Sequence, residues 1–224
     1  MDSKRSLDLG RDRKRGGSSA VHNEFWLETC RVLLHGRRVL TLIVGTNRPG
    51  SNTRQVARQV EHAYAKLGVS LRVLDLAQLP SELFSPSAYG EKPKSFAPFG
   101  EGILQAEGLI VVTPEYNGGM PGVLKYFIDM LKFPESFEGR PVCFVGLAAG
   151  MWGAIRPVEQ LQMIFGYRNA LLYPDRIFLP RIGELLTEQG AFKDPEFGKR
   201  LEAQAAGFVA FVEKVKGVKL RSAK

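Results

Sequence analysis

The chain has 224 residues, 44% of them hydrophobic, and a formal net charge of +8. That length and apolar content are enough for one α/β domain with its own core, and no apolar run approaches the roughly 20 residues of a membrane-spanning helix. The two cysteines, Cys30 and Cys143, form no CxxC pair, which argues against a disulfide framework and fits a reducing, cytoplasmic location.

Residues 1–38 are predicted to form a basic, partly disordered N-terminal extension. Residues 1–40 hold nine Lys and Arg against five Asp and Glu, which is half of the net charge. This polar composition supplies little to bury, although 23–35 fits a short helix that packs on the domain or on a dimer partner. No aromatic residues interleave with the basic cluster, so a nucleic-acid partner is not expected. A membrane partner is not expected either, since no apolar run approaches a membrane span. The alternative role of the extension is a tether to one of them.

After residue 38 the hydrophobic pattern alternates between short β-branched runs and helical stripes. Strands are expected at 39–44, 70–75, 108–113, 141–147 and 170–173, and helices at 52–67, 98–106, 121–132, 154–166 and 195–216. Asn52 with Gln55 fits a capping box at the start of the first helix. Cys143 lies inside an apolar run and is expected to be a buried thiol. Residues 76–100 are too long for a plain connection, which predicts a surface excursion with a function.

Five strands that alternate with helices predict an α/β fold over residues 39–216, followed by a basic C-terminal tail at 217–224. We expect a flavodoxin-like three-layer fold: a five-stranded parallel sheet of order 2-1-3-4-5 with helices on both faces. In this order the topological switch lies between the first and third strands, and ligands bind beyond their carboxyl ends. The loops 45–53 and 114–119 should therefore carry the binding site.

The loop 45–53 is suited to a phosphate monoester, because it stands at the N-terminus of a helix and is rich in donors. These donors are Thr46, Arg48, Ser51, Asn52 and Thr53. The spacing of Gly45 and Gly50 is that of a P-loop, but Ser51 stands where the P-loop lysine belongs, which argues against an ATPase. The other interpretation is a well-capped helix that binds nothing.

The loop 114–119, Pro-Glu-Tyr-Asn-Gly-Gly, follows a buried strand and precedes a helix that opens at Pro121. Its backbone N–H groups, around Asn117 and Gly118, could reach the polar edge of a flat ring such as an isoalloxazine. A Pro- and Gly-rich turn without a ligand is the alternative. This alternative is less favoured because the loop 45–53, which is suited to a phosphate, lies on the other side of the same switch point.

Three segments are informative together: 45–53, 113–118 and 121–129, the last with the sequence Pro-Gly-Val-Leu-Lys-Tyr-Phe-Ile-Asp. They resemble the NADPH-dependent FMN reductase family. That family covers flavin, quinone, chromate and azo-dye reductases of flavodoxin-like fold. The resemblance implies phosphate contacts from Thr46, Arg48, Ser51, Asn52 and Thr53, ring contacts from Pro114, Glu115, Tyr116, Asn117 and Gly118, and a third flavin loop with Ala149 and Gly150 beside Trp152. The family more often has Asn-Ala where this chain has Tyr126-Phe127, in a helix that helps to form the family's dimer.

The resemblance implies an enzyme: an FMN-dependent NAD(P)H oxidoreductase with NADPH as co-substrate, a small-molecule electron acceptor, and a homodimer or dimer of dimers. No metal site and no acid–base triad are expected, because hydride chemistry belongs to the cofactor. His22, His35 and His62 lie away from both loops and are expected at the surface. The chain has no GxGxxG motif, so we expect NADPH and the acceptor to use the FMN face in turn, as ping-pong turnover.

Two features remain open to more than one interpretation. Arg48 and the excursion 76–100 are candidates for holding the 2′-phosphate of NADPH. The aromatic residues of the excursion, Phe84, Tyr89 and Phe96, either wall the acceptor pocket or pack on a dimer partner, and packing is favoured. The competing function is a flavodoxin-like electron carrier without NADPH turnover, but such carriers are usually acidic, whereas this chain is basic.

Overall fold

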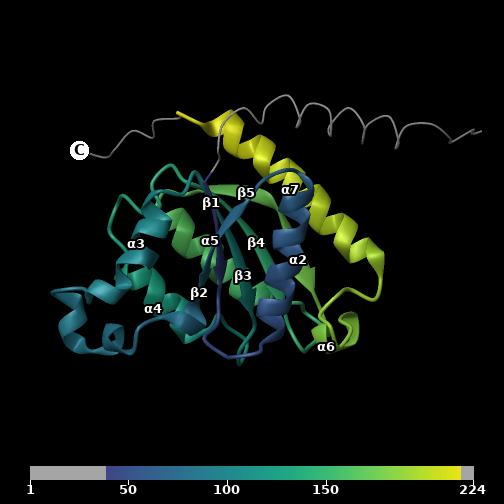
Figure 1. Cartoon of the computed structure of the whole chain (residues 1–224), viewed down its shortest axis with the longest axis horizontal. Helices are drawn as coiled ribbons and strands as arrows, with labels where there is room; N and C mark the ends of the chain where they lie inside the picture. Colours follow the sequence, from purple (N-terminus) through teal and green to yellow (C-terminus); the bar gives the residue numbers. More distant parts are fainter. Residues whose placement is uncertain (1–38, 218–224) are drawn as a thin grey trace, which may run out of the picture.

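The structure is a computed structural model that describes residues 39–217 (Figure 1). The predicted extension 1–38 and the tail beyond residue 217 lie outside the described residues. The strands are β1 (Leu40–Val44), β2 (Leu71–Asp75), β3 (Gly108–Pro114), β4 (Pro141–Leu147) and β5 (Leu171–Leu179); the α-helices are α2 (Asn52–Lys66), α3 (Ala97–Leu104), α4 (Gly122–Met130), α5 (Ile155–Tyr167), α6 (Ile182–Leu185) and α7 (Pro195–Val215). Within 39–217 no helix has the length and apolar content that a bilayer crossing requires.

The five strands form one parallel sheet of order β2-β1-β3-β4-β5, which confirms the predicted topology. β1 pairs with Leu71–Asp75 on one side and with Gly108–Val112 on the other. The strands β1, β3 and β4 are buried along their whole length, as expected for apolar runs covered on both faces. Because all the strands point the same way, the loops that follow β1, β3 and β4 meet at one edge.

Helices cover both faces of the sheet and complete the predicted three layers (Figure 1). On one face α2 and α7 bury a core that includes Val56 and Phe208. On the other face α3, α4 and α5 bury a second core that includes Phe127 and Phe165. The flavodoxin-like arrangement therefore follows from two amphipathic helix layers on one apolar sheet.

The thiol of Cys143 lies inside the α2/α7 core with no exposed surface, as predicted. The hydroxyl of Tyr64 lies 4.0 Å from its sulfur. Burial raises the pKa of the Cys143 thiol well above its usual range, and burial likewise raises the pKa of the Tyr64 phenol. Both groups are therefore neutral inside this core at physiological pH.

The prediction for the last strand, 170–173, was too short, because β5 continues to Leu179. Its pairing with β4 shifts register between Val142 and Phe144. Pro174 lies within the shifted stretch, where it cannot donate a ladder hydrogen bond. The sequence pattern thus breaks at Pro174, whereas the strand resumes beyond an irregular bulge.

The side chain of Gln204 restores hydrogen bonds at this bulge. Gln204 comes from α7 and is buried. Its Nε2 donates to the backbone oxygen of Phe144 at 3.2 Å and to that of Asp175 at 3.0 Å. A distant helix therefore stabilises the irregular part of β5, which explains why local sequence did not reveal it.

The excursion 76–100 forms four 3-10 turns ahead of α3 and packs on α4. Phe84 stacks on Tyr126 with ring centroids 5.0 Å apart, and the Tyr126 hydroxyl donates to a backbone oxygen of the excursion at 2.7 Å. Phe96 is buried and meets Phe127 edge to face at 6.1 Å. Aromatic packing thus holds the excursion against a helix of the same chain.

Candidate cofactor-binding site

Two adjoining cavities open at the carboxyl edge of the sheet, between the loops that follow β1, β3 and β4. The larger, of about 350 Å³, is lined by Arg48, Pro49, Gly50, Ser51, Asn52, Thr53, Pro114, Glu115, Tyr116, Leu147, Ala148, Ala149 and Ile182. The smaller, of about 150 Å³, is lined by Glu115, Asn117, Gly118, Ala148, Ala149, Gly150 and Trp152. Because three residues line both, the two cavities form one candidate site.

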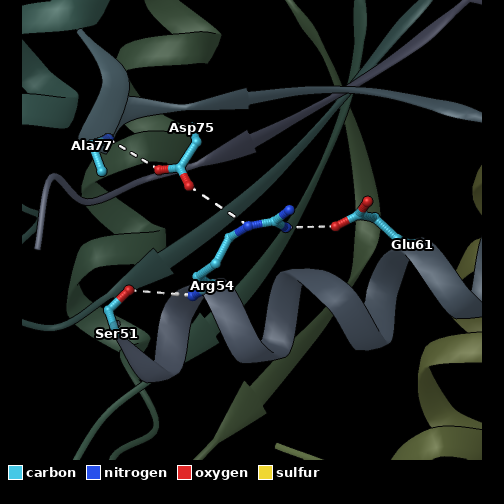
Figure 2. A network of polar contacts seen from close by, with 5 residues as sticks. All are labelled: Ser51, Arg54, Glu61, Asp75 and Ala77. Atoms are coloured by element: carbon cyan, nitrogen blue, oxygen red, sulfur yellow. Dashed lines mark hydrogen bonds and ion pairs between the residues drawn. The ribbon is translucent and has the colours of Figure 1, made fainter. Parts of the chain in front are cut away.

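The N-terminus of α2 opens into the larger cavity. Ser51 is the N-cap, and its Oγ accepts the N–H of Arg54 at 3.2 Å (Figure 2). The predicted capping box of Asn52 with Gln55 is therefore wrong, since Asn52 is already helical and the N-cap is Ser51. The backbone N–H groups of Asn52 and Thr53, the first two residues of α2, have no helical acceptor, and together with the helix dipole they favour an anion.

Arg54 stands close to this N-terminus, but its charge is engaged elsewhere. Its Nη1 lies 2.5 Å from Oε1 of Glu61, and its Nε lies 3.6 Å from Oδ2 of Asp75 (Figure 2). The other oxygen of Asp75 accepts the N–H of Ala77 at 3.0 Å. Two carboxylates therefore hold Arg54 over the side of α2. The exposed Arg48, which lines the cavity, is the cation that can meet an anion there.

Thr46 joins the first two loops beneath the site. Its Oγ1 lies 2.8 Å from the hydroxyl oxygen of Tyr116 and accepts the N–H of Arg48 at 3.2 Å. Thr46 is buried and lines neither cavity. The resemblance implied a phosphate contact for Thr46, whereas the structure gives its hydroxyl a bond between loops that follow β1 and β3.

Asn117 and Gly118 form a two-residue turn that faces the smaller cavity. Both have left-handed backbones, with φ of 51° and 77°. Tyr116 and Gly119 exchange backbone hydrogen bonds of 2.9 and 3.0 Å across the turn. This is the geometry of a type I′ hairpin turn, for which Asn-Gly is the preferred pair. The turn therefore fixes the backbone conformation of the loop 114–119 in the absence of a ligand.

The carboxyl group of Glu115 stands where the two cavities meet. Its Oε1 lies 3.5 Å from Nη1 of Arg156, and the side chain is 14% exposed. Its Oε2 is buried and has no hydrogen-bond partner within residues 39–217. A buried carboxylate oxygen normally has a donor, so this atom is an acceptor that a ligand N–H group would satisfy.

The loop that follows β4 closes the site from the third side. A Cβ atom on Gly146 would lie 2.9 Å from the backbone oxygen of Gly153, so glycine is required where this loop returns over the strand. Gly153 and Ala154 have positive φ values of 59° and 68° at the start of α5. The close return brings Ala149 and Gly150 to the cavity wall and leaves Trp152 57% exposed at the rim.

The structure brings together all the predicted site residues except Thr46 at these two cavities. Sequence reasoning missed Arg156 and Gln160, which lie four residues apart on α5. Gln160 Oε1 accepts the N–H of Met120 at 2.9 Å and so supports the Asn117–Gly118 turn. The spacing of these two polar residues on one helix face was the available signal.

His62 lines neither cavity of the candidate site. His62 is exposed on α2, as predicted, whereas His22 and His35 lie outside the described residues. Among residues 39–217 no group of three or more His, Cys, Asp and Glu side chains could hold a metal ion.

The arrangement fits the parts of FMN. The larger cavity offers an anion site made by the α2 N-terminus and Arg48. The smaller cavity offers a fixed glycine-rich rim and, in Glu115, an acceptor without a donor. A phosphate at one end and a flat ring with polar N–H and C=O edges at the other would meet these groups.

Comparison with known proteins gives a consistent result. A sequence profile described as NADPH-dependent FMN reductase matches residues 38–182, more than half of the chain. The quinone reductase of Escherichia coli K12 is 30% identical over 193 residues, which cover 80% of this chain and 97% of that protein. The NAD(P)H-dependent FMN reductase of Pseudomonas aeruginosa is 28% identical over 180 residues, with 78% and 95% covered.

Among solved structures, the flavoenzyme NAD(P)H:(acceptor) oxidoreductase FerB of Paracoccus denitrificans has a TM-score of 0.67 at 21% identity. The likeness covers 79% of this chain and 98% of FerB and supports the fold. The profile match and the sequence relatives show more than the fold: the chain belongs to the NADPH-dependent FMN reductase family, whose members are oxidoreductases that use FMN and take electrons from NAD(P)H.

Proposed function

We propose that this protein is an FMN-dependent NAD(P)H oxidoreductase that passes electrons to a small-molecule acceptor. The single observation that carries the proposal is the pair of cavities that share Glu115, Ala148 and Ala149. One cavity is suited to a phosphate and the other to the edge of a flat ring. The phosphate would be held by the α2 N-terminus, Arg48, Ser51, Asn52 and Thr53, and the ring by the residues 114–118 with Ala149 and Gly150.

Bound FMN would supply the hydride chemistry, and the protein would supply position and water exclusion. The exposed Trp152 lines the smaller cavity, where one face of a bound ring would stay open. We infer that NADPH and the acceptor use this face in turn, which is ping-pong turnover.

Quinones are the acceptor class that we propose first. Two relatives are named for such substrates, the quinone reductase of Escherichia coli and the 2-hydroxy-1,4-benzoquinone reductase of a Burkholderia species, which is 32% identical over 139 residues. A flat quinone also suits a site built for two stacked rings. Free flavins, azo dyes and metal oxyanions such as chromate are further acceptors for the same assay.

The proposal is tested with the purified full chain loaded with FMN. We expect flavin absorption bands, NADPH oxidation with benzoquinone, and parallel double-reciprocal lines when both substrates are varied. Intersecting lines would contradict the ping-pong order. A flavin-bound protein that does not oxidise NADPH would be an electron carrier, and a chain that binds no FMN would contradict the whole proposal.

Replacing Glu115 by glutamine is expected to raise the midpoint potential of bound FMN by about 30 mV, equivalent to about 1.4 kcal/mol. Reduction adds negative charge to the flavin, and a nearby carboxylate opposes it. The measurement is a spectroscopic redox titration of the FMN-loaded variant. Glu159→Gln, on an exposed position of α5, is the control and should leave the potential unchanged. Equal midpoint potentials for wild type, Glu115→Gln and Glu159→Gln would mean that Glu115 does not lie beside the flavin ring.

A homodimer is the proposed assembly, formed through the exposed side of α5. Met163 and Tyr167 lie one turn apart on this helix and are 70% and 82% exposed. Phe133 is 63% exposed, and the guanidinium of Arg168 lies 4.7 Å from its ring. Large apolar side chains exposed on one helix and beside it are typical of an interface. Tyr167→Glu should convert a dimer into a monomer in light scattering. Ala203→Glu on α7 should not, and a monomeric wild-type protein would contradict the proposal.

A further inference from the structure

A third cavity, of about 420 Å³, lies between α3 and the end of α4. It shares no residue with the two cavities of the candidate site. Its volume lies within the usual range for small-molecule sites. The function proposed above makes no use of it, so its chemistry can be considered separately.

The floor of this cavity is apolar and firmly packed. Phe96, Leu104, Met130 and Leu131 contribute to it. The ring of Phe96 stacks on Phe99 and meets Phe127 edge to face, each with centroids 6.1 Å apart. A wall held by aromatic contacts on two sides keeps its shape without a ligand.

The segment 132–136, which contributes Lys132 and Ser136 to the lining, is held by two arginines. Nε of Arg140 donates to the backbone oxygen of Ser136 at 2.8 Å, and its Nη2 donates to that of Glu135 at 3.0 Å. Nη2 of Arg168 donates to the backbone oxygen of Lys132 at 3.2 Å. The cavity is therefore preformed, which lowers the entropy cost of filling it.

Ser136 supplies a polar group that lacks a partner. It lines the cavity and is 1% exposed, and its Oγ has no hydrogen-bond partner within residues 39–217. Buried hydroxyl groups are nearly always paired, because an unpaired one has lost its hydration. A ligand with an acceptor atom at this wall would supply the missing bond.

The charges that line the cavity favour an anion. Three lysines, Lys92, Lys94 and Lys132, stand against Glu101 and Asp129. Asp129 is already paired with Lys125, whose Nζ lies 2.7 Å from Oδ2. The ammonium groups of Lys94 and Lys132 have no hydrogen bond or ion pair within the described residues, so a carboxylate would gain two cations and displace no partner.

We propose that this cavity binds a small amphipathic carboxylate. Its hydrophobic ring system packs on Phe96, Met130 and Leu131, its carboxylate lies between Lys94 and Lys132, and the Ser136 hydroxyl donates to it. This site is separate from the site of hydride transfer, so the protein with FMN bound can hold both ligands at once.

The test is calorimetric titration of 2-naphthoate into the FMN-loaded protein, with a Kd of about 100 µM expected for a ligand of this size. Gly100→Leu fills the cavity: Gly100 is helical, and a Cβ atom at this position would meet only the Phe96 ring, at 3.9 Å. We expect at least about tenfold weaker binding with an unchanged flavin spectrum. Gly198→Leu, an equally open helical glycine on α7, is the matched control.

The charge is tested with 2-naphthamide, the neutral isostere. Wild type should prefer the carboxylate by about tenfold, and Lys94→Gln with Lys132→Gln should abolish that preference. Naphthoate binding that survives Gly100→Leu would place the ligand elsewhere, including over the flavin, and would overturn the proposal. Equal binding of the acid and the amide by wild type, or a change of oligomeric mass in Gly100→Leu without a change in affinity, would do the same.

Discussion

Replacing Asn52 by aspartate is expected to weaken FMN binding by about 100-fold while the fold stays intact. Asn52 is the first residue of α2 and lines the larger cavity. Aspartate is of equal size but would stand beside the proposed phosphate, and two like charges about 5 Å apart in this setting repel by about 3 kcal/mol. The same negative charge interacts favourably with the helix dipole, so the melting temperature should not fall.

The measurement is quenching of FMN fluorescence on titration with apoprotein, at low and high salt. Asn47→Asp is the matched control, because Asn47 is exposed in the same loop but lines neither cavity. It should weaken binding far less. If both variants bind FMN as wild type does, the phosphate does not lie at the α2 N-terminus.

Replacing Phe127 by alanine is expected to lower the free energy of unfolding by about 4 kcal/mol. Phe127 has no exposed surface, and its ring meets Phe96 at 6.1 Å and Phe99 at 6.3 Å. The truncation leaves a cavity between α4 and the excursion that neither element can fill. Urea unfolding followed by circular dichroism measures the loss.

The free energy of unfolding of the neighbouring variant Tyr126→Phe is the comparison for Phe127→Ala. It removes one hydrogen bond, from the Tyr126 hydroxyl to the backbone oxygen of Leu83, and is expected to cost about 1 kcal/mol. Equal losses for the two variants would mean that aromatic packing on α4 does not hold the excursion in place.

The sheet order and the loops that form the candidate site were predictable from the sequence because both follow from short-range patterns. Buried parallel strands appear as β-branched runs, and the switch point of a five-stranded sheet selects two loops out of many. The Asn117–Gly118 turn belongs to the same class, since its backbone geometry is set by its own two residues.

What the sequence could not reveal depends on partners far along the chain. Arg54 is not available to an anion at the α2 N-terminus because Asp75, from β2, and Glu61 pair with it. β5 extends past Pro174 because Gln204 from α7 bonds its bulge. Ser51 rather than Asn52 caps α2 although both residue types are good caps, and only the path of the preceding loop decides between them.

The burial of Cys143 has a chemical consequence if quinones are the acceptors, as proposed above. Quinones are electrophiles that alkylate thiolates, and a flavin reacting with oxygen releases peroxide, which oxidises them. Cys143 is the single cysteine among residues 39–217; it has no exposed surface, and its raised pKa keeps it as the unreactive thiol. The described part of the chain therefore offers no reactive thiolate to an electrophile, and alkylation or oxidation of Cys143 is not a route to inactivation.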